Sequence, residues 1–224
     1  MPEKENNKTI KISLFPLSEI VLFPGMNLPL HIFEDKYIKM ISECIKEKKE
    51  FGVVCSKNDV CSKVGTLAEI TDVEKLEEGK MNILVEGKER FKIISFLNEK
   101  SYNEAIVELY IDTGTKIDFV VKDTLKEIRG LSLKALKMFD EVSEEEESSK
   151  KLKLPSNPNE LLFLVSANLT CSYELKQAIL ETRSIKVRAN EVLSLLKEEI
   201  QRLEVLVENK LTKKDVVKNG KLKI

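Results

Sequence analysis

The dominant period of the hydrophobic pattern in this chain changes near residue 115, and this change limits the possible folds more than any other feature. Before it, apolar residues alternate at every second position, as in Tyr102–Ile111. After it, they recur at intervals of three and four, as in Asp118–Val142. A period of two is typical of a half-buried strand, and a period of 3.6 of an amphipathic helix. The pattern predicts an α+β chain, with a β domain at residues 1–114 and an all-α helical bundle at residues 115–224.

The β half opens on an apolar stretch, Leu14–Tyr37, that three prolines interrupt. Proline fixes φ and lacks an amide donor, so a single helix cannot run through the stretch. Short extended segments are predicted at Ile12–Phe15, Ile20–Phe23 and Leu28–Phe33. Pro24-Gly25 predicts a turn, because proline presets φ at one corner and glycine accepts a positive φ at the next.

Further short strands are expected beyond a helix that Asp35 caps and that runs to about Lys49. These strands are expected at Phe51–Cys55, Val64–Val73, Met81–Glu86, Glu89–Leu97 and Tyr102–Ile111. Gly87-Lys88 separates two alternating segments and predicts a hairpin turn between them. Many short strands with frequent turns favour a closed or nearly closed antiparallel barrel, which leaves no exposed sheet edge.

The helical half is predicted to contain a long helix, Asp118–Val142, and then a buried one. Asn157-Pro158 starts the second helix, because asparagine caps a helix and proline suits its first position. The segment Leu161–Leu169 is apolar nearly all round, so this helix should be the most buried. Between these two helices, Ser143–Lys153 is acidic and then basic, which predicts a mobile connection.

Two more helices are predicted toward the C-terminus. Ser172 is expected to cap a short helix that ends at Glu181, with Leu175 facing inward. Ser184 is expected to cap a last helix of roughly 25 residues. The polar segment Lys210–Ile224 is then predicted to form a loose tail, typical of a complete short protein.

Composition argues against several classes of function. Lys and Arg number 37 and Asp and Glu 38, for a net charge of -1, which argues against a nucleic-acid partner. Apolar runs stay well short of the ~20 residues that a membrane span needs, and the N-terminus lacks the pattern of a signal peptide. The four cysteines form no C-x-x-C pair, and His31 is the single histidine. Reduced thiols in the cytoplasm are therefore expected rather than a zinc site.

No motif in the sequence predicts catalysis. The phosphate-binding G-x-x-x-x-G-K-[ST] pattern and the G-x-G-x-x-G, H-E-x-x-H and G-x-S-x-G motifs are all missing from the sequence. His31 lies between Leu30 and Ile32, and we interpret it as a half-buried structural imidazole rather than a catalytic base. We therefore predict no catalytic, cofactor-binding or metal-binding residue, and no activity as an enzyme.

Three motifs occur in a fixed order along the chain. The opening stretch reads F-P-L-x-x-x-V-L-F-P-G-x-x-L-P-L-H-I-F-E-x-x-Y, Gly87-x-x-Arg90-Phe91 follows, and a K-Q-x-x-L-E run begins at Lys176. Together they resemble the Lon N-terminal domain, the substrate-recognition region of Lon-type ATP-dependent proteases. The segment His31–Glu34 looks most like the version found in short, stand-alone Lon-domain proteins, and the resemblance covers nearly the whole chain.

The resemblance implies a PUA-like β pseudo-barrel followed by a helical bundle, and a protein-binding function without catalysis. The implied partners are unfolded or tagged protein segments, with the chain acting alone or as an adaptor for a protease or chaperone in protein quality control. The family's ATPase and Ser-Lys peptidase would begin beyond Ile224, so their catalytic residues have no counterpart here. A peptidase function would rest on resemblance alone.

The resemblance leaves the binding residues open, and the sequence nominates Phe33, Tyr37 and Met40 as peptide contacts. These three apolar residues follow the exit of the opening stretch, and ordinary core packing is the competing interpretation. Two other functions stay open: RNA binding, because PUA-like barrels include RNA-binding modules, and hydrolysis at a site without a known motif. A third alternative is that the chain is the front part of a longer Lon protease.

Overall fold

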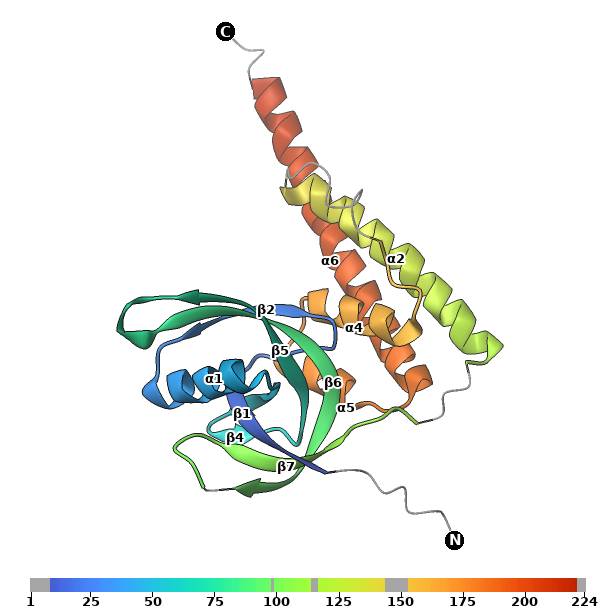
Figure 1. The fold of residues 1–224 in the computed structure, drawn as a ribbon. Helices are drawn as coiled ribbons and strands as arrows, with labels where there is room; N and C mark the ends of the chain where they lie inside the picture. The colour runs from blue at the N-terminus through green and yellow to red at the C-terminus, as the bar shows by residue number, and fades with distance from the viewer. Residues whose placement is uncertain (1–8, 98, 114–116, 144–152, 221–224) are drawn as a thin grey trace. The chain divides into compact units, whose positions relative to one another are not determined.

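The computed structural model describes residues 9–97, 99–113, 117–143 and 153–220 (Figure 1). The chain divides into two compact units. One, the β unit, consists of Met1–Gly114 with Cys171–Ser184, and the other, the helical unit, consists of Thr115–Thr170 with Ile185–Ile224. The segment Cys171–Ser184 thus groups with the β unit, whereas the sequence placed it in the helical domain.

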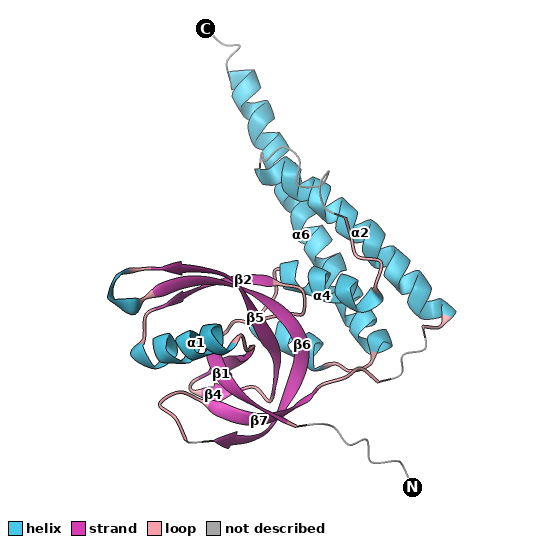
Figure 2. Ribbon diagram, viewed as in Figure 1, coloured by secondary structure: helices cyan, strands magenta, loops and turns pink. Residues whose placement is uncertain are grey.

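The strands of the β unit form one sheet that closes on itself (Figure 2). Its described strands are β1 (Ile10–Ser18), β2 (Asn27–Ile32), β3 (Phe51–Lys57), β4 (Val60–Cys61), β5 (Val64–Lys75), β6 (Met81–Leu97) and β7 (Glu104–Leu109). The order β1-β7-β6-β5-β3 returns to β1, which also pairs with β3. The predicted α+β barrel is confirmed, although β1 and β3 run parallel and the other pairs antiparallel.

The predicted hairpin at Gly87-Lys88 is wrong, because Met81–Leu97 is one continuous strand of 17 residues. Its first half pairs with β2 on one side, its second half pairs with β7, and β5 pairs along most of it. The alternating pattern predicted the strand type correctly. The turn into β6 is instead the short 3-10 segment η1 (Glu77–Gly79).

Gly87 lies where the backbone of β6 passes close to the backbone of the opening stretch, and it is not part of a turn. Its amide donates a hydrogen bond to the Met26 carbonyl (2.9 Å), and its carbonyl accepts one from the Gly25 amide (2.7 Å). A Cβ atom at position 87 would lie 2.2 Å from the Phe23 carbonyl oxygen. Position 87 therefore requires glycine, because the opening stretch comes too close for a side chain. The residues next to Gly87 in the sequence do not indicate this approach.

The opening stretch forms two strands and not three. Ile20–Phe23, predicted to be extended, lies outside the sheet strands, although Val21, Leu22 and Phe23 are buried. The predicted turn at Pro24-Gly25 is confirmed: the Met26 amide donates to the Phe23 carbonyl (3.0 Å), and Gly25 has a φ of 76°. Proline followed by a positive-φ glycine is the signature of a type II turn.

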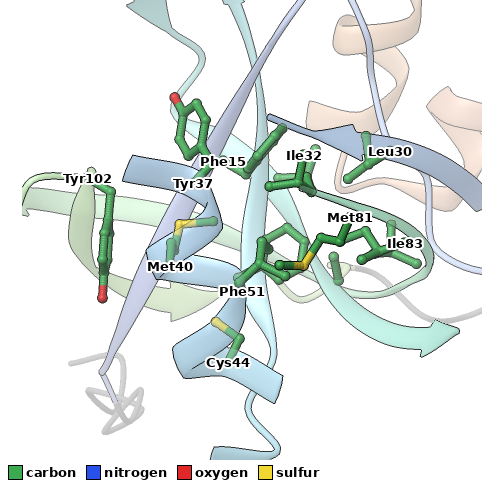
Figure 3. Close-up of a cluster of buried hydrophobic side chains, with 14 of the residues drawn as sticks. Phe15, Leu30, Ile32, Tyr37, Met40, Cys44, Phe51, Met81, Ile83 and Tyr102 are labelled. Carbon is green, nitrogen blue, oxygen red and sulfur yellow. The ribbon is translucent and has the colours of Figure 1, made fainter. Parts of the chain in front are cut away.

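One core cluster forms where α1 (Asp35–Glu47) packs against the strands (Figure 3). The N-cap is Glu34, one residue before the expected Asp35. The helix buries Tyr37, Met40, Ile41 and Cys44 against residues that include Phe15, Phe51, Met81 and Ile83. A second cluster takes side chains from β1, β3, β5, β6 and β7, with Phe91 fully buried in it.

The buried thiol of Cys44 should be chemically inert. Burial, reinforced by the Glu43 and Glu47 carboxylates, raises its pKa from 9.0 to about 11. Because the thiolate is the reacting form, two pKa units lower its population near pH 8 by about 100-fold. We expect Cys44 to react with iodoacetamide at least about 100-fold more slowly in the folded chain than in urea, and faster as the pH rises toward 11. Peptide mass spectrometry measures both rates, and equal rates would contradict the burial.

The helical unit contains α2 (Phe119–Ser143), α4 (Pro158–Asn168) and α6 (Ile185–Gly220). The predicted start of α4 is confirmed, because Asn157 Oδ1 accepts hydrogen bonds from the amides of Asn159 (2.9 Å) and Glu160 (3.4 Å). The apolar run of α4 is largely buried, as predicted. Within α6, the buried Arg188 donates to Asn159 Oδ1 (3.0 Å).

The last helix is longer than predicted. It spans 36 residues, so residues 210–220, predicted to form a loose tail, continue the helix. A helix can extend through this segment because its four Lys and one Leu have high helix propensity, and an apolar stripe is not needed at every turn. Most of the predicted mobile connection, residues 144–152, lies outside the described residues.

The helix α5 (Tyr173–Glu181) belongs to the β unit because polar side chains hold it to the strands. As predicted, Ser172 caps it, its Oγ accepting from the Leu175 amide (3.4 Å). Gln177 Nε2 donates to the Val64 carbonyl of β5 (3.0 Å). The side chain of Leu175, expected to face inward, is exposed. The face that α5 buries is therefore set by hydrogen bonds as well as by apolar periodicity.

Candidate functional site

The structure separates the three residues that the sequence nominated as peptide contacts. Phe33, just beyond β2, has 58% of its surface exposed. Tyr37 and Met40 lie on the inner face of α1 within the core, and Met40 is fully buried (Figure 3). The competing interpretation, core packing, holds for these two because α1 turns that face toward the strands. A peptide-binding role for Phe33 stays a prediction.

Phe33 directly follows β2, which forms a three-stranded antiparallel sheet with the first half of β6 and the second half of β5 (Figure 2). We call its outward-facing side the arm face. Alternate residues point to the core, among them Leu30, Ile32, Ile83 and Val85. The residues between them form the arm face: Asn27, Pro29, His31 and Phe33 from the β2 segment, Asn82, Leu84 and Glu86 from β6, and Glu69, Asp72 and Glu74 from β5.

Strand register places the residues of the arm face in rows. One row joins Pro29, Leu84 and Asp72, and the next joins His31, Asn82 and Glu74. Directly opposite residues in an antiparallel sheet have Cβ atoms roughly 5 Å apart, so the side chains within each row touch or nearly touch. The face is apolar and aromatic along β2 and acidic along β5.

A chain of hydrogen bonds fixes the row that contains the single histidine. The ring Nδ1 of His31 lies 2.8 Å from Asn82 Oδ1, and Asn82 Nδ2 donates to Glu74 Oε2 over 2.8 Å. Since the amide oxygen of Asn82 can only accept, Nδ1 of His31 carries the proton. The prediction of a half-buried imidazole was wrong, because His31 is exposed and its partner comes from a strand 51 residues away.

The Phe33 ring stacks on the His31 ring, with centroids 5.7 Å apart and planes 22° apart. This contact holds an exposed aromatic side chain in a defined place against His31, whose row adjoins the row of Pro29 and Leu84. Leu84 and Leu76 add further exposed apolar surface. An ordered aromatic ring beside aliphatic surface can cover an apolar side chain of a partner with little loss of its own conformational entropy.

The geometry of the site suits binding and shows no catalytic arrangement. Within residues 9–97, 99–113, 117–143 and 153–220, no three His, Cys, Asp or Glu side chains come together in a way that would hold a metal ion. Over that same part of the chain, no helix combines the length and apolar character needed to cross a lipid bilayer. On the arm face, the imidazole contacts an amide and an aromatic ring and has no Ser or Cys nucleophile beside it in the described contacts.

The fold has close counterparts among solved structures. A Lon N-terminal domain protein from Xanthomonas campestris superposes with a TM-score of 0.63 at 18% identity, over 83% of this chain and 98% of that one. The N-terminal domain of a Mycobacterium avium complex Lon protease gives a TM-score of 0.65 at 18% identity, over 84% and 98%. The architecture is thus that of the Lon N-terminal domain, a PUA-like β barrel with helices.

The sequence itself matches the model of one family over residues 11–198, the ATP-dependent protease La (LON) substrate-binding domain. The chain belongs to this family. It is 31% identical over 215 residues to the Lon protease of Flavobacterium johnsoniae, covering 91% of this chain and 26% of that protein. It is 29% identical to that of Cytophaga hutchinsonii, covering 87% and 25%. The chain therefore spans about a quarter of these relatives.

Proposed function

We propose that this chain binds unfolded or tagged segments of other proteins through the arm face and catalyses no reaction itself. The observation that carries the proposal is the exposed Phe33 ring, which stacks on His31, together with the apolar row of Pro29 and Leu84 on the other side of His31. Covering one large apolar side chain fully contributes about 1.5–3 kcal/mol, enough for weak, sequence-tolerant binding when two or three are covered. The family's description as a substrate-binding domain supports the same function.

We further propose that the bound segments are handed to a protease or a chaperone in the cytoplasm, with the chain as an adaptor in protein quality control. The relatives in which this region occurs are Lon proteases, and the region forms about a quarter of their length. The acidic side of the arm face and the net charge of -1 weigh against RNA as the ligand.

Replacing Phe33 by alanine should lower the affinity for an unfolded apolar peptide by about 10-fold, because the proposed contact loses its exposed, stacked aromatic ring. The fold should stay intact, since the ring is exposed. Phe96→Ala is the matched control, because Phe96 lies elsewhere on the β unit and is 54% exposed. Fluorescence anisotropy with a labelled peptide from a destabilised protein measures both affinities.

Equal losses for Phe33→Ala and Phe96→Ala would place binding elsewhere on the molecule. Absence of binding by the wild-type chain would contradict the proposed function itself. A filter-binding assay with single-stranded RNA at low salt tests the alternative ligand, and casein cleavage without ATP tests for hydrolysis. We expect neither activity above the background of an unrelated acidic domain.

A further inference from the structure

The arm face is chemically divided, and this division indicates which apolar segments it takes. Glu69, Asp72 and Glu74 follow one another along β5, in successive rows of the register. Across the sheet, the corresponding positions of β2 carry Asn27, Pro29 and His31. A partner that lies along the strands therefore meets apolar and aromatic surface on one side and carboxylates on the other.

The carboxylates differ in whether a cation already neutralises them. Lys88 pairs with both Glu69 and Glu86, at 2.8 Å in each case. Asp72 and Glu74 are exposed, and no Lys or Arg among the described residues pairs with either of them. Glu74 accepts a hydrogen bond from Asn82, which orients the carboxylate without neutralising it. Two negative charges thus lie uncompensated in adjacent rows: Asp72 in the row of Leu84, and Glu74 in the row of His31, on which Phe33 stacks.

We propose that the arm face selects apolar segments that carry Lys or Arg at alternate positions. This inference rests on the proposed function, because it names the class of segment that the same face binds. Acidic segments are disfavoured by repulsion from Asp72 and Glu74, and neutral ones gain only the apolar contact. Complementary charges across an interface govern partner choice and association rate more than total affinity.

The spacing of the carboxylates matches an extended partner. Successive rows of the arm face are two residues apart along a strand, which corresponds to about 7 Å at roughly 3.4 Å per residue. Alternate side chains of an extended peptide have the same separation and point to the same side. A segment with a basic residue at every second position therefore places successive cations opposite Glu74 and Asp72, while a flanking aromatic residue reaches Phe33.

Three labelled peptides with one aromatic anchor and the same length test the selection. Every second residue is Ser in the neutral peptide, Lys in the basic one and Glu in the acidic one. We expect the basic peptide to bind the full chain about 10-fold more tightly than the acidic one at low salt, because each exposed pair contributes a factor of a few. The preference should shrink strongly near 0.5 M salt, since screening then acts within about 5 Å.

The double variant Asp72→Asn with Glu74→Gln should reduce this preference to about twofold, because the basic peptide loses both ion pairs and the acidic peptide is no longer repelled. Glu47→Gln is the control, because Glu47 is an exposed carboxylate on α1 outside the arm face. Circular dichroism confirms that all variants are folded. A basic preference that survives in the double variant would overturn the assignment to this face.

The possible outcomes distinguish a failure of the charge selection from a failure of the proposed peptide-binding function. If all three peptides bind equally, the charge selection is wrong while peptide binding stands. If none binds, both fail. A third outcome is that the wild-type protein does not bind the peptides and sediments as a dimer, which Phe33→Ala dissociates. A second copy of the chain then occupies the face, and the inference is overturned.

Discussion

Replacing Gly87 by alanine is expected to lower the free energy of unfolding of the β unit by about 3 kcal/mol or more. A Cβ atom there would lie 2.2 Å from the Phe23 carbonyl oxygen, and backbone cannot move aside as a flexible side chain can. The substitution forces β6 away from the opening stretch and strains the hydrogen bonds of Gly87 with Met26 and Gly25. Urea denaturation followed by circular dichroism measures the loss.

Gly130→Ala is the control for this prediction. Gly130 lies within α2, and a Cβ atom there meets nothing within 4 Å. Alanine should stabilise the helical unit by about 0.5–1 kcal/mol, because glycine loses more backbone entropy in a helix. If Gly87→Ala is as well tolerated as Gly130→Ala, the close crossing of the two backbones is wrong.

Replacing Arg90 by methionine is expected to destabilise the packing of α5 on the strands by about 3–5 kcal/mol. Arg90 is buried, pairs with Asp112, and donates to the carbonyls of Leu180 (2.5 Å) and Thr182 (3.1 Å) at the end of α5. Methionine fills similar space but removes the cation and these donors. Hydrogen exchange should show faster exchange of the α5 amides in this variant.

Arg183→Met serves as the matched control for Arg90→Met. Arg183 is exposed and donates from Nε to the Ile111 carbonyl (2.6 Å), so its loss should cost less than about 1 kcal/mol. The double variant Arg90→Met with Asp112→Leu should recover part of the stability, because replacing both partners leaves no charge without its counterion. Unchanged exchange of α5 in Arg90→Met would show that apolar contacts alone hold the helix.

Much of the secondary structure follows from local patterns. The helix start at Asn157-Pro158, the cap at Ser172 and the turn at Pro24-Gly25 depend on residues within four positions of one another. The α+β division likewise follows from the change of hydrophobic period. Such features can be predicted because the atoms that create them are neighbours in the chain.

The candidate site was less predictable than the fold. Phe33, Tyr37 and Met40 are all large and apolar, so residue type alone does not separate an exposed ring from two core residues. The helical spacing of Tyr37 and Met40 with Ile41 and Cys44 was the available signal, since it indicates a buried face. The contribution of Asn82 and Glu74 had no local signal, because β5 and β6 join β2 only through sheet register.

By itself, the sequence determined the family, the two kinds of secondary structure and the caps and turns, because these depend on residue type and short spacing. Only the tertiary structure decided that Gly87 lies within a continuous strand crossed by the opening stretch, that α5 joins the β unit, and that His31 lies in one row with Asn82 and Glu74. Each of these features depends on pairing between segments far apart in the chain. Closure of the sheet and strand register determine that pairing, and the hydrophobic periodicity of a single segment does not predict it.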